Sequence, residues 1–439
     1  MKLPAIKGFN EEAFNKYLKN TGWLMFGKLL SLIVNLLITK YLGPGLFGDL
    51  SFALALITIT GAIGALGLDT FIIREIINEP HKKDEILGTS LLLRLFVNVL
   101  FVPISIGIYL FYHHFFENTG ASLTLIVALL SLISVFKSFN VIDAYFQSQV
   151  QSKYVVHVQN ICLITTALLK VLIVLLALPL IYLVIVYVFD AFILAVGLII
   201  IYKRKGLSIL KWTFNKVRAK ELLKLSSPLI LSAIMVSIYM KIDQLMLKQV
   251  SSVAVGIYSA AQNLSEAWYF IPTAIITSVF PAIINARKTD LERYEKRLKN
   301  LYDLLIYISV PVAIFISFFG NTIINIIYAD KFNGAGQMLS IHIWSGIFVF
   351  LGVASSQYLL AEGYTKISFH RTLAGAIINI LLNLWLIPQY GGVGASIATL
   401  VACFVSTFYL LLIPKTRDQG FMMLKSLFLV SLFQKIFKR

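Results

Sequence analysis

Eight ionisable residues lie well inside long apolar stretches of the sequence. A charge at the centre of a membrane-spanning helix costs about 2.5–3.5 kcal/mol on the insertion scale, so such side chains are expected to face a protein interior. The excess of cations over acids predicts a site for an anion, in which lysines act as point charges and an arginine holds two oxygens at once. The cations are Lys28, Arg94, Lys137, Lys170 and Lys241, and the acids are Asp190, Asp243 and Glu266.

Neutral polar side chains share helical faces with several of these charges. Ser31 lies three residues after Lys28 and Asn35 four residues after Ser31, which places all three on one face of a helix. We therefore expect several helices to line one polar, positively charged lumen that binds the anion. The neutral residues assigned to this lumen are Ser31, Asn35, Asn98, Gln244, Asn379 and Asn383.

Two other roles remain open for the buried charges. Some of them can pair with one another, and Lys241, Asp243 and Glu266 are the nearest candidates for such a cluster. Asp190, Asp243 or Glu266 can instead bind a coupling proton or sodium ion, because a buried carboxylate is able to hold a proton. Lys40 and Lys248 lie near the outer ends of their expected helices, so their ammonium groups are expected to extend to the membrane interface.

The elements that must position these residues are transmembrane helices. The 439 residues are 58% hydrophobic and only 13% charged, whereas soluble domains are about 25% charged. Apolar stretches of about 20 residues or more recur along the chain, and each is long enough to cross the bilayer core as a helix. The expected spans are residues 17–42, 48–73, 86–112, 122–147, 155–178, 180–202, 222–249, 255–286, 299–319, 336–361, 366–387 and 392–414.

The distribution of Lys and Arg predicts the orientation of these spans. With the amino terminus in the cytoplasm, the inner loops collect most of the basic residues, notably in 203–220 and 287–299. The opposite loops contain a single basic residue, Lys331. Both termini are therefore predicted to be cytoplasmic, and the formal net charge of +17 is mainly a signal of topology. No basic groove on a soluble domain is expected, so we predict no binding to nucleic acid.

A weak internal repeat divides the expected spans into two halves. Five residue pairs share an offset of 208 positions, among them Lys40 with Lys248 and Gly48 with Gly256. Repeated helical bundles around a site at the midplane are common in transporters. We predict two six-helix bundles around a central cavity, an all-α polytopic fold. The domains are an amino-terminal lobe (1–202), a basic cytoplasmic linker (203–221), a carboxyl-terminal lobe (222–414) and a basic amphipathic tail in the inner interface (415–439).

No set of residues in the sequence is typical of an enzyme or of a metal site. Cys162 and Cys403 lie inside apolar stretches, and the histidines at helix ends have no partners at metal-binding spacing. A membrane glycan polymerase or ligase, an alternative of another class, would need catalytic acids or bases on an outer segment. The longest outer segment, about 320–335, offers only Asp330 and Lys331. We therefore predict a transporter that uses no cofactor and no metal.

Several segments resemble Wzx-type flippases of polysaccharides and O-antigen. These proteins form the oligosaccharide flippase family of the multidrug, oligosaccharidyl-lipid and polysaccharide exporter superfamily. The resemblance covers both halves of the chain. The segments that carry it are Tyr41–Gly48, Lys241–Leu247, Val255–Ala261, Leu264–Pro272, Val279–Ala282 and Gly391–Thr399.

The resemblance implies a function in the synthesis of surface polysaccharide or lipopolysaccharide. A member of this family moves undecaprenyl-diphosphate-linked oligosaccharide from the cytoplasmic to the outer leaflet of the bacterial inner membrane by alternating access. The implied partners are this lipid-linked oligosaccharide, membrane lipid, a polysaccharide polymerase and a chain-length regulator. A flippase of lipid-linked peptidoglycan precursor and a drug or ion antiporter of the same superfamily remain alternatives. The basic lumen argues against an exporter of organic cations, which would favour acidic residues.

Overall fold

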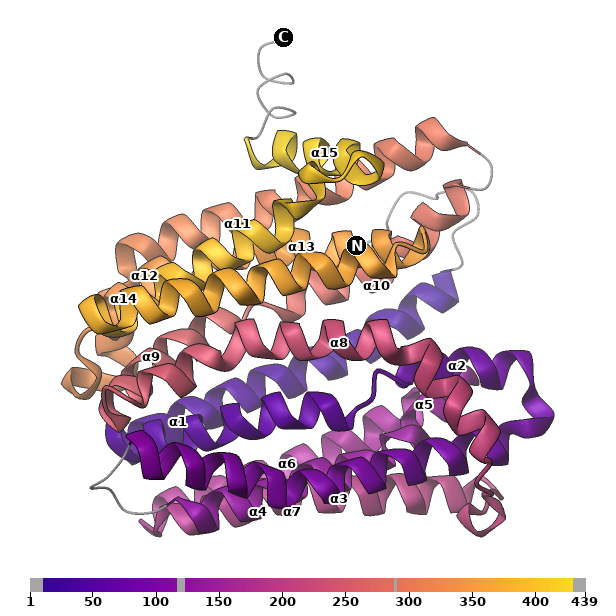
Figure 1. Cartoon of the computed structure of the whole chain (residues 1–439), viewed down its shortest axis with the longest axis horizontal. Helices are drawn as coiled ribbons and strands as arrows, with labels where there is room; N and C mark the ends of the chain where they lie inside the picture. The colour runs from indigo at the N-terminus through magenta and orange to yellow at the C-terminus, as the bar shows by residue number, and fades with distance from the viewer. Residues whose placement is uncertain (1–10, 117–122, 288–289, 429–439) are drawn as a thin grey trace. The chain divides into compact units, whose positions relative to one another are not determined.

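The computed structural model describes residues 11–116, 123–287 and 290–428, and within these ranges every regular element is a helix. Figure 1 shows the helices in chain order. The first seven are α1 (Glu11–Gly64), α2 (Asp69–Asn78), α3 (Lys83–Phe116), α4 (Thr124–Lys137), α5 (Val141–Ser148), α6 (Lys153–Leu175) and α7 (Leu180–Arg204). The others are α8 (Lys216–Leu247), α9 (Ser252–Glu266), α10 (Phe270–Arg287), α11 (Leu291–Tyr328), α12 (Ala335–His342), α13 (Ser345–Ala361), α14 (Thr365–Phe408) and α15 (Arg417–Leu427).

These helices supply the twelve expected spans. In the described ranges, nine helical stretches are long and apolar enough to cross a membrane. Two of them, α1 and α14, are kinked and each contain two spans, while α9 together with α10 covers the remaining one. The predicted all-α polytopic class is confirmed, and the chain is a multi-pass membrane protein.

Glycines produce both kinks. Gly43 in α1 has φ 68° and ψ 174°, and Gly391 in α14 has φ 54° and ψ −130°. A residue with a Cβ atom rarely adopts a positive φ, so glycine is favoured at both bends. Pro44 directly follows the first kink, and Pro388 lies just before the second. The sequence therefore placed both turns between spans correctly.

Several predicted helix boundaries were wrong. The second span, expected at 48–73, ends at Gly64, because Leu66 and Gly67 have positive φ angles and the chain restarts as α2. The ninth, expected at 299–319, extends over all of α11. Charged residues at the start of α11 lie on a continuous helix that an apolar window does not detect. Within the predicted tail, α15 is helical, and residues 429–439 lie outside the described part.

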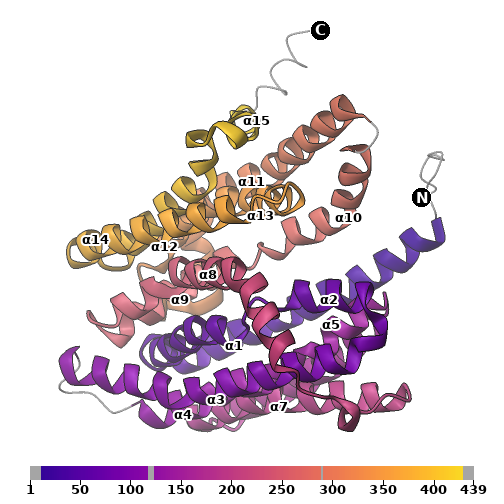
Figure 2. The ribbon, with the colours of Figure 1, turned by 45° about the vertical axis from the view of Figure 1, so that its right-hand side comes forward.

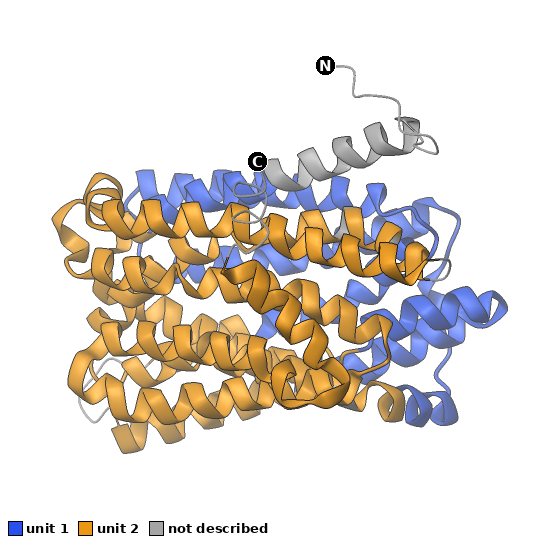
Figure 3. Ribbon diagram, turned by 90° about the horizontal axis from the view of Figure 1, so that it is seen from above, with its two compact units in different colours: residues 1–38, 68–99, 132–222 blue, residues 39–67, 100–131, 223–439 orange. Residues whose placement is uncertain are grey.

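The chain forms two compact units, which Figure 3 colours separately. Unit 1 comprises residues 1–38, 68–99 and 132–222, and unit 2 comprises 39–67, 100–131 and 223–439. Boundaries fall inside α1, α3, α4 and α8, so these four helices contribute to both units. The predicted division into lobes at 203–221 rests on the repeat in the sequence, whereas the two units rest on contacts in the structure. The division into lobes therefore stays a prediction.

Unit 1 is built on two helix pairs, α6 against α7 and α2 against α5. Its core includes Ile72, Ile142 and Tyr202, all of which are fully buried. Arg218 lies in the first turn of α8 and forms ion pairs with two carboxylates of this unit. One is near the end of α2 and the other just after it. The Arg218 guanidinium lies 3.3 Å from Glu75 and 2.8 Å from Glu79. The predicted basic linker is therefore anchored to unit 1 by an ion-pair network.

Unit 2 contains a packed group of helices, α11 to α14, which lie side by side in both Figure 1 and Figure 2. In the same unit, α9 packs on α12 and α14, and α15 packs on α11. Fully buried apolar side chains such as Leu305, Leu351 and Ala398 fill the spaces between these helices. This packing is the framework for the polar cluster described below.

The residues that suggested an internal repeat meet in unit 2. A Cβ atom added at Gly48 would lie 1.7 Å from the carbonyl oxygen of Ser252. One added at Gly256 would lie 1.9 Å from the carbonyl oxygen of Pro44. Pro44 and Ser252 are separated by the same 208 positions as Gly48 and Gly256, so the contact pairs equivalent residues of the two halves. This reciprocal contact supports the internal repeat.

Candidate functional site

Unit 1 gathers three of the predicted lumen residues where α1, α6 and α7 meet. The Lys170 ammonium lies 4.0 Å from the centre of the Tyr187 ring, a cation–π contact. The Tyr187 hydroxyl donates to Asn35 Oδ1 at 3.5 Å. One turn from Lys170, the Thr166 hydroxyl donates to Asp190 at 3.0 Å. The cluster therefore holds a cation on an aromatic face and keeps its carboxylate hydrogen-bonded to a hydroxyl.

Asp190 is the acid that balances part of this charge. It interacts electrostatically with both Lys170 and Lys137, although it makes no direct ion pair with either. The side chains of Lys28 and Lys137 are exposed, and neither has an ion-pair partner among the described residues. One carboxylate thus faces two lysines, which leaves a net positive charge.

Arg94 occupies a different part of the same unit. It is 2% exposed, and its Nη2 lies 2.8 Å from Asp69 Oδ1. The Asp69 side chain is 60% exposed, so the pair opens to the surroundings on one side. The Arg94 Nε has no hydrogen-bond partner within residues 11–116, 123–287 and 290–428, and one turn along α3 Asn98 donates to Ser138 at 2.9 Å. Arg94 therefore keeps a donor for a further acceptor.

The fifth predicted cation, Lys241 in unit 2, is paired. Its ammonium lies 3.1 Å from Glu266 Oε2, and Gln262 donates to the other oxygen of that carboxylate at 2.7 Å. Gln244 donates to Gln262 at 2.8 Å and completes a continuous chain. The sequence left several roles open for Lys241 and Glu266. In the structure these two residues form an ion pair. Asp243 takes no part in this pair.

Asp243, on α8, is fully buried and surrounded by neutral polar groups from α9 and α14. It accepts hydrogen bonds from the Tyr258 hydroxyl at 2.6 Å, from the Asn383 amide and from the Thr399 hydroxyl. Asn379 Oδ1 in turn accepts from Asn383 at 3.1 Å. No Lys or Arg lies within ion-pair distance of Asp243 in the described ranges. Two asparagines predicted for the lumen therefore surround this carboxylate.

The chemistry of this set suits a proton or a hard monovalent cation. It offers carboxylate, hydroxyl and amide oxygens, and the oxygen Asn383 Oδ1 has no hydrogen-bond partner. Oxygen ligands of this kind are preferred by hard cations. By contrast, the described residues contain no group of three His, Cys, Asp or Glu side chains that could hold a metal ion.

The interfacial position predicted for Lys248 was wrong. Its side chain is 2% exposed, and its ammonium lies 2.6 Å from Asp49 Oδ1. Ser252 donates to the same carboxylate oxygen at 2.6 Å. The helix-end position of Lys248 resembled that of an interfacial lysine, but the close contact between the repeated segments brings Asp49 within reach. Lys40 is exposed, so its interfacial position stays a prediction.

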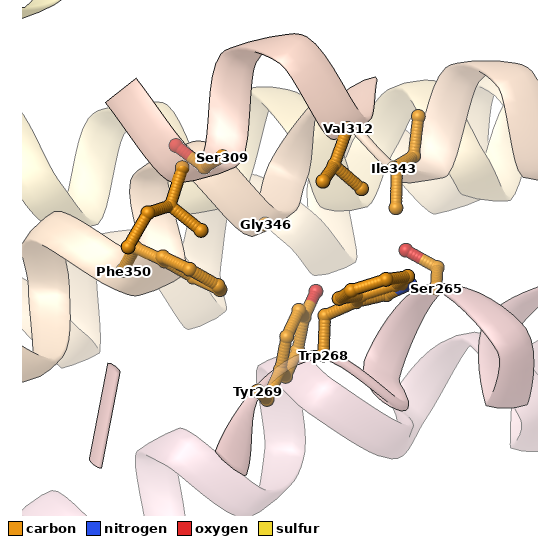
Figure 4. Close-up of a pocket in the computed structure, with 9 residues that line it drawn as sticks. Ser265, Trp268, Tyr269, Ser309, Val312, Ile343, Gly346 and Phe350 are labelled. Carbon is orange, nitrogen blue, oxygen red and sulfur yellow. The ribbon is translucent and has the colours of Figure 1, made fainter. Parts of the chain in front are cut away.

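A small cavity in unit 2 lies between the end of α9 with the turn that follows it, α11 and the start of α13, and it is drawn in Figure 4. Trp268 and Tyr269 lie across it from Val312 and Ile343. Its volume is about 20 Å³, close to the least that a single water molecule needs. This cavity is therefore too small to hold a substrate.

The sequence analysis missed several residues that the structure places beside these charges. Tyr187, Tyr258 and Thr399 were unassigned because a hydroxyl in a transmembrane helix carries no signal of its own. Arg371 was also unassigned, although it lies one turn before Gly375 on the face of α14 that bears Asn379. Extending that i, i+4 pattern towards the helix start would have found it.

Comparison with protein families finds one match. The model of a family described as "Polysaccharide biosynthesis protein" matches residues 37–337. The matched region includes all of the predicted lumen residues except Lys28, Ser31, Asn35, Asn379 and Asn383.

Two curated archaeal relatives are similar over part of the chain. An uncharacterized membrane protein of Methanocaldococcus jannaschii is 28% identical over 228 residues, which are 48% of this chain and 44% of that protein. The probable flippase AglR of Haloferax volcanii is 30% identical over 159 residues, 35% of this chain and 33% of that protein. The chain thus matches less than half of the length of either relative.

Among solved structures, the fold is similar to that of the lipid II flippase MurJ in an inward closed conformation. The TM-score is 0.73 at 16% sequence identity, and the match covers 95% of this chain and 93% of that one. At this identity the likeness concerns the fold alone. It covers nearly the whole of both chains, so it includes both compact units.

Proposed function

Because the chain belongs to the family of polysaccharide biosynthesis proteins, as the resemblance read from its sequence predicted, we propose that it is a flippase for a lipid-linked oligosaccharide. It moves an oligosaccharide joined through a diphosphate to a polyisoprenoid lipid from the cytoplasmic to the outer leaflet. In a bacterium the carrier is undecaprenyl diphosphate, and the glycan is an O-antigen or other surface polysaccharide repeat. The probable flippase AglR supports the transport activity proposed here.

One observation carries this proposal: the cations of unit 1 outnumber the acids beside them. Asp69 and Asp190 are the acids that interact with Arg94, Lys137 and Lys170, and Lys28 adds a fourth positive charge. A diphosphate supplies the missing negative charge. Lysines attract it as point charges, while the buried Nε–H of Arg94 donates a hydrogen bond.

The lobes predicted from the sequence, 1–202 and 222–414, rock about the cargo in this proposal. Asn35, Ser31 and Asn98 hydrogen-bond the first sugars, and the polyisoprenoid tail stays in the bilayer. Outward movement of an anion across an inside-negative membrane is favoured by about 2.3 kcal/mol per charge per 100 mV. The same potential favours return of the empty, positively charged site.

Asp243 is the candidate for ion coupling. A buried carboxylate without a cationic side chain is neutralised by a proton or by Na⁺, and either one alters the hydrogen bonds that join α8, α9 and α14 at this point. Asp190 is a weaker candidate because its charge is already shared with two lysines. Glu266 is paired with Lys241.

The proposed location is the bacterial inner membrane or its equivalent. The distribution of Lys and Arg supports an orientation with both termini in the cytoplasm. A polysaccharide polymerase and a chain-length regulator would use the exported repeat on the outer side. Peptidoglycan-precursor transport and drug or ion antiport are the rival functions, and polymerase or ligase activity is the enzymatic one. The net positive charge of unit 1 argues against a cationic drug as cargo.

The test removes three of the cations and keeps the rest of the chain. The triple variant K28Q/R94Q/K170Q is compared with K40Q/K203Q/K331Q, which loses the same charge at positions outside the proposed site. In a deletion strain, the first variant should let lipid-linked oligosaccharide accumulate on the cytoplasmic side, while the control restores export. Full export by the first variant, at equal amounts of inserted protein, would refute the proposed site.

A further inference from the structure

Arg371, on α14 of unit 2, is a buried cation that has no carboxylate partner among the residues the structure describes. It is 4% exposed. Its Nη1 donates to Ser355 Oγ at 2.6 Å, and its Nη2 donates to the Gly352 carbonyl oxygen at 3.0 Å and to Ser356 Oγ. All three acceptors are neutral, and they all lie on α13. The positive charge is therefore buried and hydrogen-bonded, but it is not balanced by an acid.

This makes Arg371 unlike the other buried cations of the described chain. Arg94 lies 2.8 Å from Asp69, and Lys248 lies 2.6 Å from Asp49. A buried charge is normally paired, because desolvation without a counter-charge is strongly unfavourable. If Arg371 served only to join α13 to α14, we would expect every N–H group of its guanidinium to have an acceptor. The Arg371 Nε–H has no hydrogen-bond partner in the described part of the chain.

The unbalanced guanidinium lines a cavity between α8, α13 and α14. The cavity has a volume of about 180 Å³, enough for several water molecules at about 30 Å³ each. Its wall carries hydroxyl groups from all three helices. The hydroxyl-bearing residues of the lining are Ser232, Tyr239, Ser356, Ser368, Thr372, Ser406 and Thr407.

Some of these hydroxyls are available to a ligand. Ser368 and Ser406 make no side-chain hydrogen bond within the described ranges, whereas Ser232 and Thr372 bond to each other at 3.3 Å. No carboxylate lines the cavity. A cavity with one guanidinium, free hydroxyl donors and no acid has the chemistry of an anion site, because all of its strong groups can donate hydrogen bonds to oxygen.

We propose that this cavity binds a phosphate-type oxyanion, held by the guanidinium of Arg371 and by the hydroxyls of Ser368 and Ser406. The planar fork of arginine matches the oxygens of phosphate, and the volume of the cavity exceeds that of a halide ion. The site consists only of residues of unit 2, includes none of the cations assigned to unit 1, and does not depend on the flippase function. The phosphate comes either from solution or from the headgroup of an anionic lipid.

Thermal unfolding of the purified full-length protein tests this proposal. The protein is placed in phosphatidylcholine nanodiscs and titrated with inorganic phosphate, with sodium chloride at matched ionic strength as the reference. A parallel series replaces part of the phosphatidylcholine with phosphatidic acid. A ligand that binds the folded state raises the melting temperature, Tm, in a saturable manner.

Two variants and one control locate the effect. R371Q should weaken the apparent affinity about 10- to 100-fold, the loss expected when charged hydrogen bonds are removed. V236F fills the cavity from α8 and leaves Arg371 in place, and it should abolish the effect. K366Q removes a positive charge from an exposed position on the same helix and should behave as the wild type.

The outcomes separate the two sources of phosphate. A saturable rise in Tm with inorganic phosphate identifies a soluble oxyanion, and a rise only with phosphatidic acid identifies a lipid headgroup. Either rise in Tm supports the site if it is absent in V236F and present in K366Q. If R371Q does not fold, the result with V236F decides alone. No rise with either probe, or unchanged affinity in V236F, would overturn the proposal.

Discussion

The ion pair between Lys248 and Asp49 gives a prediction whose size follows from the structure. Lys248, near the end of α8, and Asp49, in α1, are 2.6 Å apart, and their side chains are 2% and 20% exposed. Ser252 donates to the same carboxylate oxygen. Three variants dissect the contact: K248M, D49N and the double variant K248M/D49N.

Each single substitution removes one partner and leaves the other buried. Breaking a fully buried pair costs about 3–5 kcal/mol. Because one-fifth of the Asp49 side chain is exposed, we expect the low end, about 3 kcal/mol. For a chain longer than 250 residues this corresponds to a fall in Tm of roughly 3–6 °C. The double variant leaves no unpaired charge, so its loss should be smaller than the sum of the single losses by about 2 kcal/mol.

Thermal unfolding in nanodiscs, followed by tryptophan fluorescence, measures all four proteins under one set of conditions. K40M, which removes the lysine at the equivalent, exposed position of the first repeat, is the matched control and should leave Tm nearly unchanged. If the two single losses add to give the double loss within about 0.5 kcal/mol, the pair is not coupled and the reasoning is refuted.

Three further predictions follow from the described contacts. G256A would place a methyl group 1.9 Å from the Pro44 carbonyl oxygen, so it should destabilise the protein by at least about 1–3 kcal/mol in thermal unfolding. The ion pairs of Glu79 lower the pKa of its carboxyl below the ordinary 4.5. E79Q should therefore lower Tm at pH 7, and its difference from the wild type should shrink as the pH falls through that lowered pKa. D243N should abolish the dependence of transport on a proton or Na⁺ gradient, measured in proteoliposomes.

Each of these has a matched control. Gly45 lies in α1 with no atom within 4 Å of an added Cβ, so G45A should be tolerated where G256A is not. E292Q removes an acid that makes no ion pair in the described chain, and it should show no pH-dependent difference from the wild type. D330N removes an acid outside the Asp243 cluster and should keep ion coupling. The same behaviour in a variant and its control would contradict the corresponding prediction.

The class of fold was predictable because twelve apolar stretches and their turns are local features. The kinks at Gly43 and Gly391 lie where the sequence placed turns between spans. The ends of helices were less predictable. The break after Gly64 depends on positive φ angles at Leu66 and Gly67, and nothing in an apolar window marks them.

The partners of the buried charges were not predictable from one sequence. Lys241 and Glu266 are 25 positions apart and meet because α8 and α9 are consecutive helices, so this pair was a reasonable expectation. Asp49 and Lys248 are 199 positions apart and meet only through the contact between repeats. The neutral surroundings of Asp243 likewise combine distant segments, which only tertiary packing brings together.

In the proposed function, the protein moves a lipid-linked glycan by binding its diphosphate. The most direct test is to reconstitute the purified protein in liposomes and follow transbilayer movement of two matched probes. One carries the glycan on polyisoprenyl diphosphate, and the other carries the same glycan on a neutral polyisoprenyl ether. We predict rapid flipping of the diphosphate probe and no flipping of the neutral one above protein-free liposomes. Equal rates for the two probes, or no movement of either, would contradict the account.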